Sequence, residues 1–382
     1  MATSIKVKTV ESKQERDDFF LLPWDIHEDD KNWVPPLLLS VKQTLDTAKN
    51  PFWKHAKQKL WVAYQGGACV GRIAGVIDES HNKFHGETTA FWGFFECIND
   101  IEVARALFSV VEAWSREQGM NVLRGPMNPS TNHECGLQIN AFDTKPFIMM
   151  TQNPAYYPEL VEKAGFSKAK DLYAWLLDNS RKFDDKLVQN AKRLQESQGI
   201  VVRPIDMAKY EEEIEKIIEV YNDAWEKNWG FVPMTNEEFR HMAKDMKPIL
   251  VPQLVYIVEV RGETAGFSLW LPDLNQVMAK IPDGKLFPAG LIKLLWYTKV
   301  KRIVNRGRIL TLGVKKKYRN LGLASLLYLR YYEDAPALGY PLGECSWILE
   351  DNAAMNQGLK LMKADLYKTY RIYDKPLTTQ LN

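Results

Sequence analysis

The chain has 382 residues, of which 46% are hydrophobic and 26% charged, as in a globular protein long enough for two domains. Fifty Lys and Arg against 48 Asp and Glu leave a net charge of +2. That charge is too small for the sequence-independent phosphate attraction that drives duplex binding, so nucleic acid is not an expected partner. Four scattered cysteines without a CxxC pair indicate neither a disulfide framework nor a metal site. With no signal peptide and no long apolar run, a cytoplasmic protein is expected.

The first half of the chain is predicted to alternate strands and helices, an order typical of an α/β sandwich. Alternating apolar residues around a Gly-Gly turn indicate a hairpin, and a longer amphipathic stripe indicates a helix packed on a sheet. The expected elements are Pro-interrupted helices within residues 14–47, a hairpin from Leu60 that turns at Gly66-Gly67, a strand near Ala90–Phe95, a helix capped by Asn99 or Asp100 and ended by Gly119, and a strand at Val122–Arg124.

The second half repeats this plan, so the chain is expected to be a duplication of one fold. Gly262 and Gly266 reproduce the four-residue spacing of Gly67 and Gly71 in the first hairpin. A polar stretch over residues 178–198 separates the copies and predicts domains 1–180 and 181–382. The expected elements of the second copy are a helix capped by Asp206, a helix over Thr235–Met246, a hairpin from Val255, a strand at Ile309–Val314, a helix at Leu323–Tyr332 and a strand at Glu344–Leu349.

An insertion at Gly125–Met150 is unusually polar for a segment that leaves a buried strand. We expect it to line an acceptor site, with Glu134 as general base, directly or through a water, and His133 as second choice. Cys135 as a nucleophile is a minor alternative. The competing interpretation is a structural loop whose Ser, Thr and Asn side chains satisfy their own backbone.

A second insertion, Pro272–Arg306, contains a basic amphipathic stretch with aromatic residues at Leu286–Val304. One interpretation is a cap that rests on a membrane surface or shelters an acyl chain. The other, which we favour at this point, is a helix packed between the domains.

The strand-to-helix junction at Val314–Leu327 carries the strongest chemical signal. The first N–H groups of a helix have no intrahelical partner, the helix dipole adds positive charge, and small residues at Gly322 and Ala324 let a ligand approach the backbone. The pattern predicts a site for a diphosphate, with one of Lys315–Lys317 or Arg319 meeting a phosphate. The alternative for the lysines is a solvated basic face.

The pattern Val314-x-x-x-Tyr318-Arg319-x-x-Gly322-x-Ala324-x-Leu326-Leu327 resembles the acyl-CoA loop of the GNAT superfamily of acyl-CoA N-acyltransferases. The resemblance implies two GNAT-like domains in tandem, each a mixed central sheet flanked by helices. The first copy looks degenerate, because Phe94–Asp100 occupies the loop position with acidic residues and without Arg or Gly. The chain is also similar to a bacterial group of tandem GNAT proteins, some of which are thought to acylate sphingoid bases.

The same resemblance implies a set of site residues. Backbone at Leu312 and Val314 would pair with the pantetheine arm of CoA, and Asn352 would touch that arm. The backbone N–H groups that would hold the diphosphate are those of Arg319, Asn320, Leu321, Gly322, Leu323, Ala324 and Ser325. The position at which many members carry a Tyr that protonates the CoA thiolate matches Leu359, so that role is vacant or moved.

We therefore predict an N-acyltransferase that moves an acyl group from acetyl-CoA or a longer acyl-CoA to a primary amine, small molecule or lipid, by direct attack in a ternary complex. Residues 181–382 would be catalytic, and residues 1–180 would shape the acceptor pocket. Glu134, or another carboxylate such as Glu350, would accept the proton of the amine. The alternative is a catalytically silent acyl-CoA-binding or regulatory protein. No metal is expected, and the oligomeric state is left open.

Overall fold

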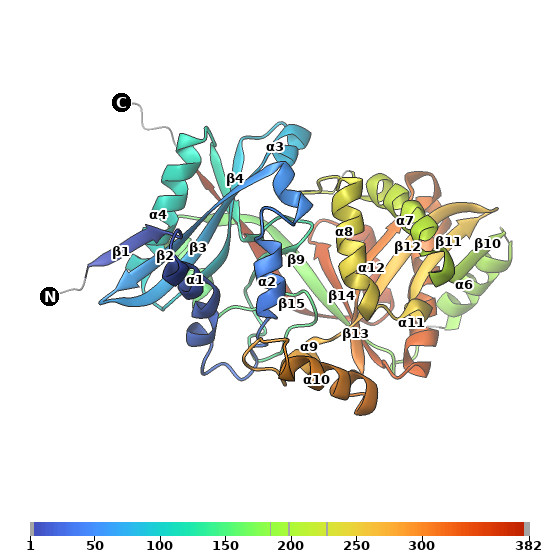
Figure 1. The fold of residues 1–382 in the computed structure, drawn as a ribbon. Coiled ribbons are helices and arrows are strands. Elements are labelled where there is room, and N and C mark those ends of the chain that lie inside the picture. Colours follow the sequence, from blue (N-terminus) through green and yellow to red (C-terminus); the bar gives the residue numbers. More distant parts are fainter. Residues whose placement is uncertain (1–3, 184, 198, 227, 378–382) are drawn as a thin grey trace. The chain divides into compact units, whose positions relative to one another are not determined.

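The computed structural model describes residues 4–377 except 184, 198 and 227. Figure 1 follows the chain from blue to red. The chain divides into two compact units: unit 1 is Met1–Leu172, Met278–Ile292 and Lys368–Asn382, and unit 2 is Tyr173–Val277 and Lys293–Tyr367. Two later segments, Met278–Ile292 and Lys368–Asn382, thus belong to the same unit as the first part of the chain. A single boundary near residue 180 would assign them to the second domain. The acceptor and catalytic roles given to residues 1–180 and 181–382 stay predictions.

Unit 1 is built on a mixed sheet in the order β1-β2-β3-β4-β5-β15. Its strands are β1 (Ile5–Thr9), β2 (Ala56–Gln65), β3 (Ala68–Asp78), β4 (Thr89–Cys97), β5 (Val122–Gly125) and the part of β15 (Asp365–Pro376) from Lys368 onward. β4 and β5 run parallel, whereas the other neighbouring strands in this order are antiparallel. The hairpin predicted at Gly66-Gly67 is confirmed, and both glycines have positive φ.

In the part of unit 1 up to Leu172, the described residues form five α-helices: α1 (Lys13–Ile26), α2 (Leu38–Thr44), α3 (Glu79–His85), α4 (Ile101–Glu117) and α5 (Tyr157–Lys163). Asp100, one of the two expected caps, accepts a hydrogen bond from the Glu102 N–H at the start of α4. The buried stripe of α4 packs closely on β3, where a Cβ on Gly71 would lie 2.7 Å from Leu107 Cδ1. This close packing explains why a glycine stands at position 71, four residues after Gly67.

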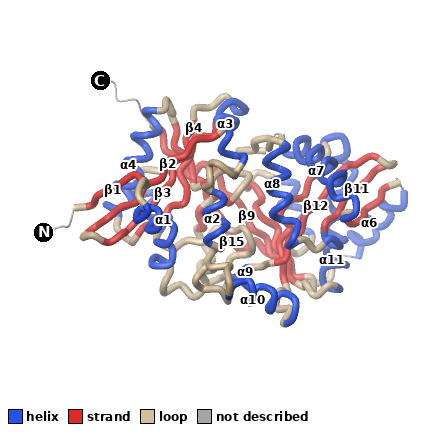
Figure 2. The backbone as a smooth tube through the Cα atoms, viewed as in Figure 1, coloured by secondary structure: helices blue, strands red, loops and turns tan. Residues whose placement is uncertain are grey.

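Unit 2 is built on a sheet in the order β9-β14-β13-β12-β11-β10 (Figure 2, red). Its strands are the part of β9 (Ser167–Asp178) from Tyr173, β10 (Ile200–Pro204), β11 (Val255–Val260), β12 (Glu263–Pro272), β13 (Arg306–Val314) and β14 (Leu342–Leu349). β13 and β14 are parallel, and β10 to β13 are antiparallel neighbours. The predicted α/β class, with a mixed sheet flanked by helices, is confirmed.

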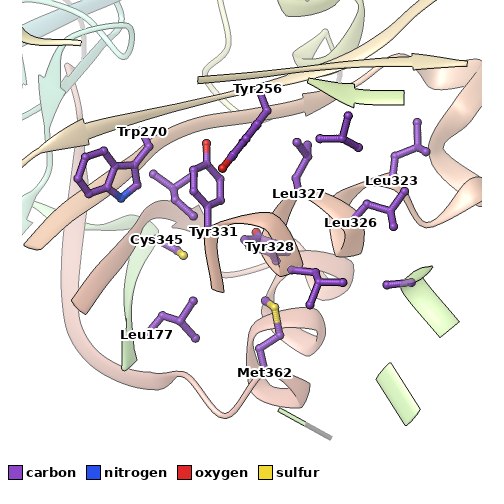
Figure 3. Close-up of a cluster of buried hydrophobic side chains, with 14 of the residues drawn as sticks. Leu177, Tyr256, Trp270, Leu323, Leu326, Leu327, Tyr328, Tyr331, Cys345 and Met362 are labelled. Carbon is purple, nitrogen blue, oxygen red and sulfur yellow. The ribbon is translucent and has the colours of Figure 1, made fainter. Parts of the chain in front are cut away.

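Helices cover both faces of the unit 2 sheet. Leu326, Leu327 and Tyr331 of α11 (Leu323–Ala337) pack in one apolar core with Tyr256 and Trp270 (Figure 3). A second core joins α7 (Tyr210–Trp225) to the other face of the sheet. The remaining helices of eight or more residues are α6 (Asp185–Ser197), which lies in the polar stretch whose residues 184 and 198 are outside the described residues, α8 (Asn236–Met246) and α12 (Ala353–Leu361).

Two predicted helix starts can be compared with the structure. Thr235 caps α8 in a capping box with Glu238, so the helix expected at Thr235–Met246 is confirmed. The expectation that Asp206 caps the next long helix is wrong. Asp206 caps a short 3-10 turn, Met207–Lys209, and α7 begins only at Tyr210.

The two insertions contain short elements. The first holds β6 (Met127–Asn128), β7 (Glu134–Cys135) and β8 (Leu137–Gln138). The second holds α9 (Asn275–Met278), α10 (Ala289–Leu295) and a π-helical turn, η5 (Trp296–Val300). No helix in the described part of the chain is long and apolar enough to cross a membrane.

Candidate active site

A β-bulge and a strand separation coincide in the middle of unit 2. β13 and β14 are paired only from Arg306↔Leu342 to Ile309↔Cys345, although β13 continues to Val314 and β14 to Leu349. On its other side, β13 pairs Ile309 with Trp270 of β12 and Thr311 with Leu269, so Leu310 is the extra residue of a bulge. Leu312 and Val314, the predicted partners of pantetheine, therefore lie on the stretch of β13 that is not paired with β14.

The chain then enters the predicted diphosphate turn. β13 is followed by the 3-10 helix η6 (Lys316–Leu321), and Gly322 begins α11 in the left-handed conformation with φ +71°. No described side chain caps α11. The Ser325 N–H donates to the Gly322 carbonyl, whereas the N–H groups of Leu323 and Ala324 lie at the positive end of the helix dipole. Gly322 itself is exposed, so an anion can approach these groups from solvent.

A cavity of about 110 Å³ begins at this turn. It runs between α11 and α12, with the segment around α6 as a third side. Most of its wall is apolar, including Tyr328 and Met362 (Figure 3). The lining residues are Phe183, Val188, Ala191, Ala324, Ser325, Tyr328, Leu329, Ala354, Met355, Gly358, Leu361 and Met362. An extended ligand held at the Ala324 end would therefore have an apolar groove beside it.

Two further sequence-predicted positions lie at α12. Asn352 is its N-cap, and the side-chain Oδ1 accepts the Met355 N–H at 3.2 Å. Leu359, at the position where a Tyr was considered, is fully buried in the core beneath α11. Of the tyrosines near this region, Tyr332 stacks on Phe183 with ring centroids 4.0 Å apart.

The basic residues of the turn are engaged with neighbouring acidic groups. The contacts are Lys315 with Glu219 at 2.6 Å, Lys316 with Glu226, Lys317 with Glu263, and the Arg319 guanidinium with the Ala224 carbonyl at 2.6 Å. The hydrogen bond from Lys317 holds the pKa of the Glu263 carboxyl below its usual value. The pairs of Lys316 and Lys317 are exposed to solvent and contribute little, so a phosphate can replace them at small cost, whereas Lys315 is buried. The prediction that one of these side chains meets a phosphate is not tested by these contacts.

A buried polar cluster, which the sequence analysis did not identify, lies where β13 and β14 part. The Arg308 Nε donates to Ser346 Oγ at 2.8 Å, and that hydroxyl donates to Glu344 Oε1 at 2.6 Å. The Tyr367 hydroxyl donates to the other Glu344 oxygen. Arg308 and Glu344 are register partners, each almost fully buried. The available signal was a charged residue, Arg308 or Glu344, inside each of two strands whose later residues are mostly apolar.

This cluster lies on the sheet face opposite α11. Ile309 and Cys345, the next register pair, belong to the α11 core, and side chains alternate between faces along a strand. The carboxylate of Glu344 therefore lies across the sheet from the α11 turn, beside the end of the β13–β14 pairing. A second buried carboxyl, Asp273, lies 2.7 Å from Arg306, and burial raises its pKa to about 6.

In unit 1, β4 is the strand that corresponds to β13. Tyrosine side chains of the same unit bind the backbone at its end. β4 and β5 pair from Thr89↔Val122 to Phe91↔Arg124. Beyond this pairing, the Cys97 N–H donates to the Tyr157 hydroxyl and the Cys97 carbonyl accepts from the Tyr156 hydroxyl, both at 2.8 Å. Burial raises the pKa of Tyr157 well above its usual value, so this group stays neutral. In this copy, tyrosines thus occupy backbone groups that a pantetheine arm would need.

The predicted catalytic residues are distributed over both units. Glu134 lies on β7, half-buried, opposite Asn128 of β6. His133 precedes it, with Nδ1 2.9 Å from Ser130 Oγ. Both belong to unit 1, whereas Glu350 follows β14 in unit 2. Among the described residues, no group of three or more His, Cys, Asp or Glu side chains is placed to hold a metal ion.

Comparisons with known proteins add relatives of nearly full length. The chain is 37% identical over 378 residues to the "Bacterial ceramide synthase" of Caulobacter vibrioides, covering 98% of both chains. It is 34% identical over 380 residues to "Protein YghO" of Escherichia coli, covering 97% of this chain and 95% of that one. No family model matches. Among solved structures, a tandem GNAT protein from the clavulanic acid biosynthesis pathway aligns with a TM-score of 0.56 at 13% identity, over 99% of this chain and all of that one, which shows a shared fold.

Proposed function

Because the chain belongs to the protein family that includes the Caulobacter vibrioides bacterial ceramide synthase, we propose that it N-acylates a long-chain sphingoid base with a fatty acyl-CoA. The coarser prediction holds without this proposal: the chain is a tandem GNAT-fold N-acyltransferase. No observation favours the catalytically silent alternative. To this coarser statement the proposal adds two identities: the acceptor is a lipid amine, and the donor carries a long acyl chain. The cytoplasmic location stays a prediction.

The observation that carries the proposal is the combination of elements around β13. The stretch from Leu310 to Val314 is not paired with β14, the open start of α11 at Gly322 follows it, and the apolar groove begins beside that start. Two parts of acyl-CoA match the first two features in the same order: a polar arm that can pair with strand backbone, and a diphosphate that can accept hydrogen bonds from the start of a helix. The residues present therefore suit this co-substrate, with anion binding supplied by backbone amides.

The reaction forms one bond and breaks one. The neutral amine nitrogen attacks the thioester carbonyl carbon, the C–N bond forms, and the C–S bond breaks with departure of the CoA thiolate. One proton leaves the nitrogen and one is taken up by the thiolate. The base must act before or during attack, since an ammonium group has no lone pair.

Three carboxylates and one imidazole are candidates for this proton transfer. Glu134, His133 and Glu350 are the candidates from the sequence, and their roles remain predictions. Glu344 is added by its location beside the end of the β13–β14 pairing and by its hydrogen bond from Tyr367. A proton taken up at this cluster can pass between Ser346, Glu344 and Tyr367, because each is hydrogen-bonded to the next.

The proposed acceptor is tested by measuring CoA thiol release with a fixed fatty acyl-CoA and a panel of amines. We expect release with long-chain 2-amino-1,3-diols and much less with a short-chain amino diol that carries the same head group. Equal rates with both amines would contradict a lipid acceptor. Release that is independent of any amine would contradict acyl transfer to nitrogen.

A further inference from the structure

The segment from Phe287 to Val300 presents an unusual concentration of exposed apolar side chains. Among the described residues, five of the twelve large hydrophobic side chains that are exposed lie here. Their exposed fractions are Phe287 64%, Ile292 68%, Leu295 51%, Trp296 49% and Val300 60%. A soluble protein rarely leaves such a group uncovered unless it binds something. We call these five residues the cap surface.

Four of the five cap-surface residues lie on a continuous helical segment, α10 followed by η5, and Phe287 lies just before it. Ile292, Trp296 and Val300 follow one another at intervals of four residues, which places them along one side of a helix. The segment begins in a tight turn, because a Cβ on the buried Gly290 would lie 2.1 Å from the Lys285 carbonyl oxygen. Ile292, Leu295, Trp296 and Val300 therefore belong to a helix that follows a defined turn.

Every charged residue from Lys285 to Arg302 is basic. Lys285, Lys293, Lys299, Lys301 and Arg302 are all exposed in or next to the segment. No Asp or Glu occurs anywhere between Asp283 and Glu333. A basic rim around an apolar face with a Trp is complementary to a bilayer with anionic head groups, whose interior receives the apolar side chains while its surface attracts the cations.

We propose that the cap surface docks the protein on an anionic bilayer. The uniform positive charge disfavours a second copy of the same face as the occupant, because like charges would meet. The choice of a bilayer rests in part on the proposed function, since a long-chain amine resides in a membrane and a docked enzyme would take it from there. The structure thus assigns a place of substrate pickup that the acyl-CoA site does not supply.

Vesicle flotation of the full chain tests this proposal independently of catalysis. Large unilamellar vesicles of phosphatidylcholine with one third phosphatidylglycerol are compared with pure phosphatidylcholine. We expect the protein to float with the anionic vesicles at least tenfold more than with the neutral ones, and less as salt is raised, because screening weakens the attraction of the basic rim. Absence of binding to anionic vesicles would overturn the proposal.

Substitutions test whether the cap surface is the part of the protein that binds the vesicles. The double variant Leu295→Glu, Trp296→Glu should reduce flotation at least tenfold, whereas Leu21→Glu on α1, at a side chain 46% exposed, should leave it unchanged. Equal binding by the double variant and wild type would overturn the assignment, as would a vesicle-independent dimer that the double variant abolishes. If the double variant keeps its rate on detergent-dispersed amine but loses it on vesicle-embedded amine, docking serves catalysis. A wild type that floats but acylates no amine would contradict the proposed function and leave the docking intact.

Discussion

Replacing Gly322 by Asp tests the diphosphate site with little expected effect on folding. Gly322 is exposed at φ +71°, and a Cβ there would lie 3.4 Å from Leu194 Cδ2. Asp and Asn adopt this conformation more readily than other side chains, at a cost of about 1 kcal/mol. A carboxylate at the start of α11 recovers about 0.3–1 kcal/mol from the helix dipole. The free energy of unfolding should therefore change by less than about 1 kcal/mol.

The expected effect on acyl-CoA binding is much larger. The carboxylate introduced by Gly322→Asp would stand next to the N–H groups of Leu323 and Ala324 and repel the diphosphate. Loss of two hydrogen bonds to a charged group, at about 1.5–3 kcal/mol each, weakens binding by about 3–6 kcal/mol, which is at least a hundredfold. Gly322→Asn has the same shape without the charge and should weaken binding about tenfold or less.

Isothermal titration calorimetry with CoA and with a fatty acyl-CoA measures both variants, and urea unfolding checks that they are folded. An Asp variant with wild-type affinity would refute the diphosphate site at this turn. Equal losses for Asp and Asn would show that shape, and not an anion, is what the turn recognises.

Four other substitutions give separate tests. Glu344→Gln should lower turnover at least tenfold near neutral pH while sparing acyl-CoA affinity, and Tyr367→Phe should lower it less; a wild-type pH–rate profile in both would remove the buried cluster from the proton path. Glu134→Gln should likewise lower turnover without changing acyl-CoA affinity, and unchanged rates across pH would exclude it as the base. Because burial raises the pKa of Asp273 from its ordinary 3.8 to about 6, its stabilising contribution is full below pH about 4 and is lost as pH rises through about 6. Relative to wild type, Asp273→Asn should therefore gain about 2 kcal/mol of unfolding free energy between pH 4 and pH 7, measured by urea denaturation, and a difference that is flat with pH would contradict the shifted pKa.

Local signals in the sequence predicted several elements of both units well. The turn at Gly66-Gly67, the Asp100 cap of α4 and the capping box at Thr235 each depend on a few neighbouring residues, so a short window contains the information. The junction from β13 to α11 is of the same kind, because its strand, its left-handed glycine and its helix follow in one continuous run.

Long-range register could not be predicted in the same way. The stretch from Ile309 to Leu312 has the apolar character of an uninterrupted strand, and the bulge at Leu310 arises only from pairing with β12. Arg308 and Glu344 are likewise brought together by the parallel register of β13 and β14, although they are distant in the sequence. No local pattern specifies such a pairing.

The sequence also could not predict which partners individual side chains contact. A run of lysines gives the same charge whether each one faces solvent or an acidic neighbour, so the pair of Lys315 with Glu219 could not be expected. Similarly, the acidic loop of the first copy indicated a copy that cannot hold phosphates, but not that Tyr156 and Tyr157 bond the Cys97 backbone. These contacts depend on how α5 is placed against the end of β4.

The central claim is tested most directly by identifying the product by mass spectrometry. The purified protein is incubated with a fatty acyl-CoA and a long-chain sphingoid base, with the Gly322→Asp variant as control. We predict a product whose mass equals the base plus the fatty acid less one water, with the acyl group on nitrogen, one free CoA per product, and almost none from the variant. Free fatty acid with no amide, or equal amide from the variant, would contradict the claim.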